Sequence, residues 1–273
     1  MSRVKFSVFT LAFPGRTAEE ALRLAAEVGF DGVDMRTNRD GHIYIDASRE
    51  VRRRLVELAD SLNIKIFSVY SYLGGDLVSP DPGVRERAVQ ELVAHVDLAV
   101  DLGATYVRIF PGTKERTREN YERFIESCRL ACREAEDRGV YIGMETHGEL
   151  AYSGDTCNLI LERVGSEFLK VVYDVAGVHM QGLNPLKELR EIDLGHVIAV
   201  QFHDFVKEEG RWRPVLLGEG EVPHEGIAKY LKDMGYEGFI VDEYEKWWHP
   251  HELPDPEEGL PHELSYLKKL FEV

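Results

Sequence analysis

Short apolar runs alternate with longer amphipathic stretches along the whole chain. Seven of these runs follow a residue that tolerates the left-handed conformation in which helices commonly end. These residues are Gly29, Asn63, Gly103, Gly139, Gly165, Gly195 and Gly235. Each is therefore a predicted junction between a helix and the strand after it. Together with the opening run KFSVFT, the junctions predict eight strands.

The stretches between the runs have the spacing of helices. Apolar residues recur at i, i+3 and i+4 in 121–135 and again in 84–102, and Thr17 with Glu20 forms a capping box. Strands that alternate with helices predict a parallel sheet, and eight such units predict one (β/α)8 TIM barrel over residues 1–273. A doubly wound open sheet is the alternative. It is disfavoured because the first junction, FTLAFPGRT, lacks a Gly-x-Gly-x-x-Gly phosphate loop.

The last four predicted strands all end in side chains that can bind a metal ion. In a parallel barrel these ends meet at the C-terminal mouth, where enzymes of this architecture have their active sites. A single carboxylate at a strand end is commonly a surface group, but four consecutive units favour a shared site. The side chains are Glu145, Asp174, Gln201 with His203, and Glu243.

Two Glu, one Asp and an amide or imidazole suit a hard or borderline divalent cation. We expect Mn²⁺, with Mg²⁺, Co²⁺ and Zn²⁺ as alternatives, and the absence of cysteine ligands argues against a structural zinc site. Such an ion can polarise the carbonyl of a sugar-like ketone and acidify the adjacent C–H bond. A carboxylate on each side of that carbon could then remove and return the proton.

The composition limits the partners. A formal net charge of -16 argues against nucleic acid and against anionic membranes. No apolar stretch approaches the roughly 20 residues that span a bilayer, and the start MSRVKFSVFT lacks a signal-peptide core, so we expect a cytoplasmic protein. Cys128, Cys132 and Cys157 are expected to be buried thiols.

Five segments, in their order and spacing, resemble the xylose-isomerase-like TIM-barrel superfamily, the sugar-phosphate isomerase/epimerase group. They are GFDGVDMR, LGATYVRIFPG, METHGE, YDVAGVHMQGLNP and LGEGEVPHEGIAKYLKDMGYEGFIVDEYE. The resemblance covers essentially the whole chain. It implies metal ligands at Glu145, Asp174, the end of the seventh strand, and Glu243. It also implies that Glu145 and Glu243 exchange a proton through an enediolate of a small ketose, keto-acid or sugar derivative.

The chain departs from the family pattern in two places. Many members have the sequence His-x-Lys-Asp in the seventh strand. Aligning Asp204 with that Asp favours Gln201 as the ligand and places His203 against the substrate. The reverse assignment stays open. Ketose 3-epimerases carry a His three residues after the Asp ligand, where this chain has Gly177. His179 follows in the same loop but does not occupy the same position, so a tagatose- or psicose-type substrate is not implied.

Several other residues are candidates for substrate binding. His147 and Arg108 are expected to face into the mouth, where Arg108 could bind an anion; Arg36 is expected instead to neutralise nearby acids. Aromatic residues after the third and eighth strands could cover a sugar ring or simply pack. They are Tyr70, Tyr72, Trp247 and Trp248. The segment LGEGE (217–221) could form a backbone nest for an anion or only a turn.

A sugar isomerase or epimerase that acts on a small molecule is the function we favour. A dehydratase of a keto-polyol, of the inosose or dehydroshikimate type, would use the same site. An abasic-site endonuclease would need more histidine ligands and a basic face. A non-catalytic accessory subunit would be expected to have lost an acidic ligand. A homodimer or homotetramer is compatible with the sequence.

Overall fold

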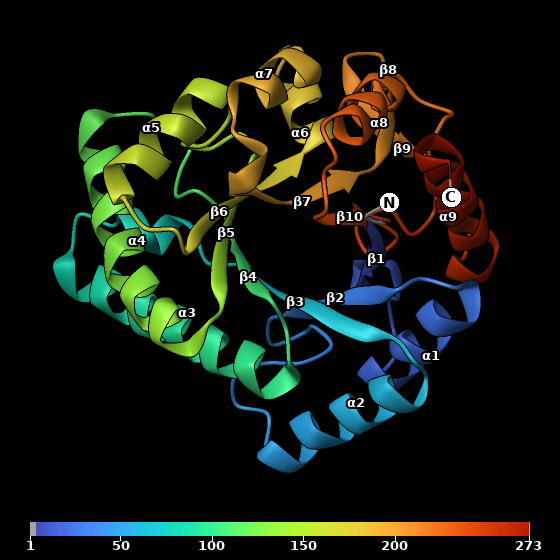
Figure 1. The fold of residues 1–273 in the computed structure, drawn as a ribbon, viewed down its shortest axis with the longest axis horizontal. Coiled ribbons are helices and arrows are strands. Elements are labelled where there is room, and N and C mark those ends of the chain that lie inside the picture. Colours follow the sequence, from blue (N-terminus) through green and yellow to red (C-terminus); the bar gives the residue numbers. More distant parts are fainter. Residues whose placement is uncertain (1–3, 273) are drawn as a thin grey trace.

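Eight parallel strands close into a barrel in the order β1-β10-β7-β6-β5-β4-β3-β2. The computed structural model describes residues 4–272, and Figure 1 shows the helices arranged around the strands. This is the predicted (β/α)8 TIM barrel. The strands are β1 Lys5–Phe9, β2 Gly32–Thr37, β3 Lys65–Ser71, β4 Tyr106–Ile109, β5 Tyr141–Glu145, β6 Leu169–Asp174, β7 Val197–Phe202 and β10 Phe239–Asp242.

The helices cover the outside of the barrel and bury their apolar stripes against it. In α4, for example, Phe124, Cys128 and Ala131 are buried at the predicted helical spacing. The helices are α1 Ala18–Val28, α2 Arg49–Ser61, α3 Pro82–Leu102, α4 Arg118–Arg138, α5 Gly154–Val164, α6 Val175–Met180, α7 Pro185–Glu191, α8 His224–Asp233 and α9 Pro256–Phe271. Within residues 4–272, none is long and apolar enough to cross a membrane.

Six of the seven predicted junction residues have a positive φ, as the end of a helix requires. Gly195 is the exception, and its prediction as a helix end was wrong. Helix α7 stops earlier, at Glu191, and Gly195 lies in a short 3-10 turn, Leu194–His196. There its backbone N–H donates to the Asp193 carboxylate at 2.9 Å, so a side-chain cap shapes this junction.

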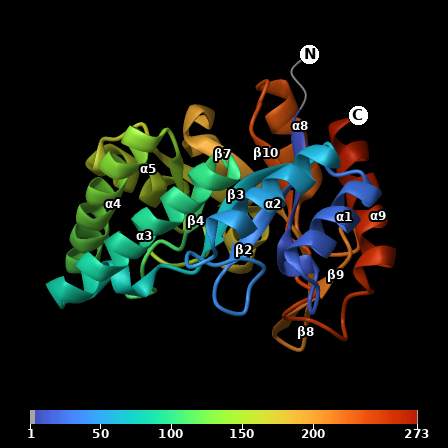
Figure 2. The same ribbon diagram turned by 90° about the horizontal axis from the view of Figure 1, so that it is seen from below.

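An antiparallel hairpin interrupts the seventh barrel unit, between β7 and α8, and was not predicted. It consists of β8 Asp204–Glu208 and β9 Arg211–Val215, and it lies at the lower right of Figure 2. Glu209 and Gly210 both have positive φ, which is the backbone of the tight turns that connect hairpin strands. A cleft separates the hairpin from the loop between β10 and α9, which contributes His249 and Glu252 to its wall.

The barrel encloses an apolar cluster that is separate from the layer between strands and helices. Its buried members are Phe9, Leu11, Tyr70, Tyr106, Val172, Ala199 and Val241. Because side chains fill the lower interior, the polar residues at the strand ends lie above a packed core, at the mouth of the barrel.

Candidate metal centre and active site

The strand register brings the predicted ligands to one end of the barrel. Asp174 of β6 pairs with Gln201 of β7, and Gln201 pairs with Val241 of β10. Glu243, two residues beyond Val241, therefore lies level with His203, which is two residues beyond Gln201. All these residues are buried, and none is more than 8% exposed as a whole residue.

Gln201 lies between the two glutamates. Its Nε2 donates to Oε1 of Glu145 and to Oε2 of Glu243, each at 2.7 Å. His203 Nε2 lies 2.8 Å from Oδ1 of Asp174 and 3.9 Å from Oε2 of Glu243. Five potential ligands from four successive barrel strands thus meet around one point.

Asp174 has a second, structural role. It is the N-cap of α6, where its Oδ1 accepts the backbone N–H of Gly177 at 2.7 Å. A Cβ at position 177 would overlap the Asp174 carboxylate, so the glycine leaves room for this carboxylate in its position. The histidine that ketose 3-epimerases carry there cannot fit without displacing Asp174.

Burial and neighbouring charges shift the pKa values of the ionisable side chains at the mouth. Burial raises the pKa of Glu243 to about 8; the charges of Glu145 and Asp174 add to this, and His203 opposes it. Burial alone would lower the pKa of His203, but Asp174 and Glu243 together raise it to about 10. The pKa of Asp174 is lowered, because the contacts with His203 outweigh its burial.

Arg108 points into the mouth from β4, as predicted. Its Nε lies 3.5 Å from Oε2 of Glu145, and Nη1 donates to the Ser71 carbonyl at 2.9 Å. The guanidinium also packs over the rings of Phe110, at 4.2 Å, and Tyr70, at 4.7 Å. The pKa of Arg108 is raised even though it is buried, because Glu145 is so close.

The two histidines predicted to contact substrate lie at the rim. His147 is 48% exposed, and its Nδ1 lies 3.3 Å from Glu149 Oε1. The Glu149 and Glu145 carboxylates raise its pKa to about 9 against the effect of burial. No hydrogen bond joins His147 to Glu145 in the described chain, so it does not orient that ligand directly. His179, in α6, packs edge-on against Trp212 of the hairpin at 5.5 Å.

Arg36 behaves differently from Arg108. Its Nη1 donates to the Asp40 carbonyl at 2.9 Å, its Nη2 to the Asp40 carboxylate at 3.3 Å, and its Nε to the Tyr72 hydroxyl at 3.1 Å. The Trp247 ring stacks 4.0 Å from the guanidinium. These contacts use its donors within the protein, as the prediction of an acid-neutralising role requires. Trp248, which is 52% exposed, stands beside this group at the rim.

The LGEGE segment does form a nest, but the anion inside it belongs to the chain. The Asp204 carboxylate accepts four backbone N–H groups at 2.9 to 3.1 Å, from Phe205, Gly218, Gly220 and Val222. The nest therefore fastens the loop after the hairpin to the end of β7. These four N–H groups already donate to Asp204 and are therefore not free to bind a substrate anion.

Two residues near the ligands were missed in the sequence. His224, at the start of α8, contacts the His203 carbonyl through Nε2 at 3.1 Å and so supports the backbone of that residue. Glu245 lies two residues beyond Glu243, and its raised pKa, caused by burial, is opposed by the nearby His203 and His249. The period of two along a strand could have found Glu245; nothing in the sequence places His224.

One further carboxylate is buried deeper in the barrel. Asp34 of β2 accepts hydrogen bonds from the hydroxyl groups of Ser7, Ser68 and Tyr106. Burial raises its pKa to about 6 in spite of these three hydrogen bonds. Its oxygens are satisfied within the protein, which distinguishes it from the acids at the mouth.

The donors at the mouth fit a divalent cation. Ligand atoms of Asp174, His203 and Glu243 lie within 4.8 Å of one another. Glu145 Oε2 and Gln201 Oε1 are buried and have no hydrogen-bond partner within residues 4–272. Three clustered carboxylates, one of them with an oxygen that accepts no hydrogen bond, are an arrangement that a hard or borderline divalent ion stabilises.

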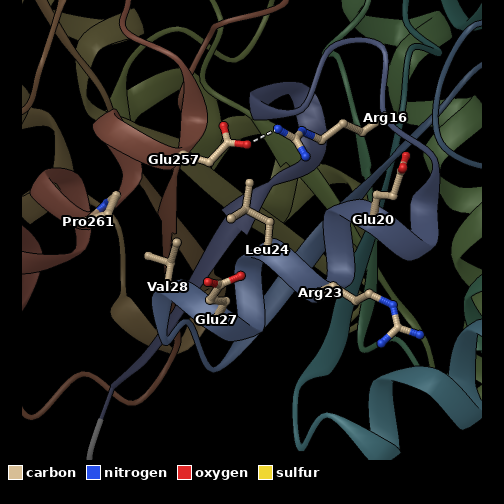
Figure 3. A pocket seen from close by; sticks show the side chains of 8 residues that line it. All are labelled: Arg16, Glu20, Arg23, Leu24, Glu27, Val28, Glu257 and Pro261. Carbon is tan, nitrogen blue, oxygen red and sulfur yellow. Dashed lines mark hydrogen bonds and ion pairs between the residues drawn. The ribbon is translucent and has the colours of Figure 1, made fainter.

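A groove on the outer surface of the barrel contains none of these residues. It lies between α1 and α9, where Arg16 forms an ion pair with Glu257 across its upper end (Figure 3). Leu24 and Val28 of α1 form its apolar part. Its position on the helical layer separates it from the candidate chemistry at the mouth.

Comparisons with known proteins agree with this architecture. Three solved structures each match almost the whole chain at low sequence identity. A probable 3-DHS dehydratase, AsbF, from Bacillus anthracis has a TM-score of 0.80 at 17% identity over 97% of this chain and 99% of its own. The IOLI protein with a bound zinc atom has a TM-score of 0.82 at 17% identity over 98% of both chains.

A D-psicose 3-epimerase with D-tagatose, from Clostridium cellulolyticum H10, has a TM-score of 0.81 at 16% identity over 99% of this chain and 100% of its own. No curated protein sequence matches the chain. The family model described as xylose isomerase-like TIM barrel matches residues 22–270. The chain therefore belongs to the xylose isomerase-like TIM barrel family.

Proposed function

We propose that the protein is a divalent-metal-dependent isomerase or epimerase of a small ketose, keto-acid or sugar derivative. The observation that carries the proposal is the position of Glu145 and Glu243. Both carboxylates lie 2.7 Å from the same amide nitrogen of Gln201, so they face one small volume from two strands. A substrate carbon in that volume would have a proton acceptor on one side and a proton donor on the other.

Glu145, Asp174, Gln201 and Glu243 would hold the ion. Mn²⁺ is the ion we favour, with Mg²⁺, Co²⁺ and Zn²⁺ as alternatives; the zinc atom of the IOLI structure supports a divalent ion in this architecture. Bound there, the ion would polarise the substrate carbonyl and acidify the neighbouring C–H bond.

The other side chains would bind and orient the substrate. Arg108 has a buried Nε with no hydrogen-bond partner within residues 4–272, and it lies next to Glu145, where it can bind an anionic or hydroxyl oxygen of the substrate. His203, His147 and His179 would contact the rest of the substrate. Proton transfer would pass from the substrate carbon to one glutamate and back from the other through an enediolate.

Exchange with solvent tests the proton transfer. The Mn²⁺-loaded protein is incubated in D₂O with a panel of small ketoses and hydroxy keto-acids, and deuterium is measured by NMR. We expect deuterium on the carbon next to the carbonyl of a converted substrate. Glu145→Gln and Glu243→Gln should each lower the rate by about 100-fold or more, because general acid–base catalysis is lost. Glu219→Gln, at an exposed carboxylate, is the control and should keep full activity.

Full activity in either site variant would contradict the assigned roles, and turnover without deuterium at that carbon would contradict the enediolate. A dehydratase is the second candidate. It is favoured by the likeness to the probable 3-DHS dehydratase and by Gly177, which replaces the histidine of ketose 3-epimerases. Mass spectrometry separates the two reactions, since a dehydrated product is lighter by one water.

A further inference from the structure

Strand β7 ends with two potential ligands on the same face, Gln201 and His203. Both reach the same oxygen: Oε2 of Glu243 is 2.7 Å from Gln201 Nε2 and 3.9 Å from His203 Nε2. His203 Nε2 is also 2.8 Å from Oδ1 of Asp174. The His203 imidazole therefore lies among the carboxylates, between Asp174 and Glu243.

We propose that His203 binds the divalent ion through Nε2 in addition to Gln201, so that β7 supplies two ligands and the site contains one nitrogen donor. The inference rests on the proposed metal-dependent function. It also departs from the His-x-Lys-Asp pattern that many family members show, because the lysine at the position of His203 would remain a cation and could not act as a ligand.

The distances between the donors support this assignment. Ligands with bonds of about 2.0–2.2 Å to one ion lie about 3 Å apart when adjacent and about 4 Å apart when opposite. The contacts of Nε2 with Asp174 and Glu243, at 2.8 and 3.9 Å, have these two values. Asp174, His203 and Glu243 also form the one group of three His, Cys, Asp or Glu side chains found to be close enough to share an ion within residues 4–272.

Burial separates His203 from the other histidines of the mouth. Its side chain is 9% exposed, whereas that of His147 is 48% exposed. The ring packs edge-on against Phe205 at 5.1 Å, and the His203 carbonyl is held by His224 at 3.1 Å. A buried ring that packs on Phe205, on a backbone that His224 supports, and with Nε2 among the acids is arranged as a ligand, while the exposed His147 is the better contact for substrate.

A nitrogen donor changes the expected choice of ion. Mg²⁺ prefers oxygen ligands only, whereas Mn²⁺, Co²⁺ and Zn²⁺ accept imidazole, with the affinity increasing in that order. The inference therefore predicts a site that discriminates against Mg²⁺.

Pulsed EPR of the Mn²⁺-loaded full-length protein tests the inference without measuring activity. We expect a ¹⁴N hyperfine coupling from a directly bound nitrogen, and its replacement by a ¹⁵N coupling when histidine alone is labelled with ¹⁵N. His203→Gln should remove the coupling and weaken Mn²⁺ binding by about tenfold or more. His147→Ala and His179→Ala are the matched controls and should keep both the coupling and the affinity.

A wild-type spectrum of bound Mn²⁺ without nitrogen coupling would overturn the inference, as would a coupling that persists in His203→Gln. The labelled wild-type protein gives this answer even if that variant does not fold. Either result would leave the proposed function intact, because Glu145, Asp174, Gln201 and Glu243 would still hold the ion. Failure of the proposed function looks different: Mn²⁺ would not bind, or Glu145→Gln and Glu243→Gln would retain full activity.

Discussion

Four buried carboxylates of this protein form two pairs that differ in how their oxygens are satisfied. Asp34 receives three hydroxyl hydrogen bonds, and Asp204 receives four backbone N–H groups. At the mouth, Glu145 and Glu243 share one donor, the amide of Gln201. Both pairs lie in the same barrel, yet Glu145 and Glu243 receive far fewer hydrogen bonds than Asp34 and Asp204.

This difference separates structure from function. A buried charge is stable when hydrogen bonds or an opposite charge replace the water it has lost, and an uncompensated one is unfavourable. The chain supplies that compensation for Asp34 and Asp204, which marks them as structural. At the mouth this compensation is incomplete, because His203 and Gly177 contact Asp174 while Glu145 and Glu243 share one amide donor, and a bound cation would supply the rest.

Removing Asp204 should give the largest loss of stability. In Asp204→Ala, the N–H groups of Gly218, Gly220, Val222 and Phe205 lose their acceptor, and two of these residues, Phe205 and Val222, are buried. An unsatisfied buried donor costs about 1–3 kcal/mol, so the free energy of unfolding should fall by about 4 kcal/mol or more. Urea unfolding followed by circular dichroism measures the change.

Asp204→Asn is the matched control. Its remaining carbonyl oxygen can accept part of the hydrogen bonds, so the variant should lose less than half as much stability. If Asp204→Ala unfolds within 1 kcal/mol of the wild type, then the nest does not hold this loop, and Asp204 would belong with the weakly satisfied acids.

Asp34 should give the next largest effect, through pH. Its pKa is about 6 in the folded protein against 3.8 for the ordinary group. Its protonated form therefore favours the folded state fully below pH 3.8, and this contribution is lost as pH rises through 6. The loss amounts to about 3 kcal/mol, since each pKa unit corresponds to about 1.4 kcal/mol.

The comparison of Asp34→Asn with the wild type isolates this contribution. Measured by urea unfolding in EDTA from pH 4 to 7.5, the stability of the variant relative to the wild type should rise by that amount. Asp137→Asn, at an exposed carboxylate, should show no such trend. A flat difference for Asp34→Asn would mean that the three hydroxyl groups compensate the buried charge completely.

The sequence predicted the barrel and the candidate ligands because both follow from local patterns. Buried parallel strands appear as apolar runs, and their C-terminal ends meet whatever the details of packing. That reasoning placed Glu145, Asp174, Gln201 and Glu243 at one mouth. The hairpin was missed because residues 204–215 mix charged and apolar side chains, and its Glu-Gly turn is a weaker signal than Asn-Gly or Asp-Gly.

The sequence did not predict which polar groups form hydrogen bonds with one another. Arg36 and Arg108 both follow the inward pattern of their strands. Arg36 donates hydrogen bonds to Asp40 and Tyr72, whereas Nε of Arg108 makes no hydrogen bond within the described chain. The LGEGE nest was recognisable, but its anion, Asp204, is fixed only by three-dimensional contacts. Partner choice depends on the packing of distant segments, so no local pattern encodes it.

The last predicted effect concerns Glu243, where ionisation opposes folding as it does at Asp34. Its pKa is about 8 in the folded protein, so in EDTA its ionisation opposes folding increasingly as pH rises from 4.5 to 8. Glu243→Gln removes that cost and keeps an acceptor for Gln201. At pH 9 in EDTA the variant should therefore be more stable than the wild type by about 1 kcal/mol or more, as when other uncompensated buried charges are replaced.

Mn²⁺ should reverse this difference and make the wild type more stable than Glu243→Gln. At 100 times the dissociation constant, an ion that binds only the folded state stabilises it by about 2.7 kcal/mol, and Glu243→Gln, with one ligand fewer, should gain much less. Thermal unfolding in EDTA and in excess Mn²⁺ measures both signs. A variant that is less stable than the wild type in EDTA would place Glu243 among the satisfied carboxylates. The contrast with Asp34 and Asp204 would then fail, since Glu243 would be stabilised by the protein alone and would not need an ion.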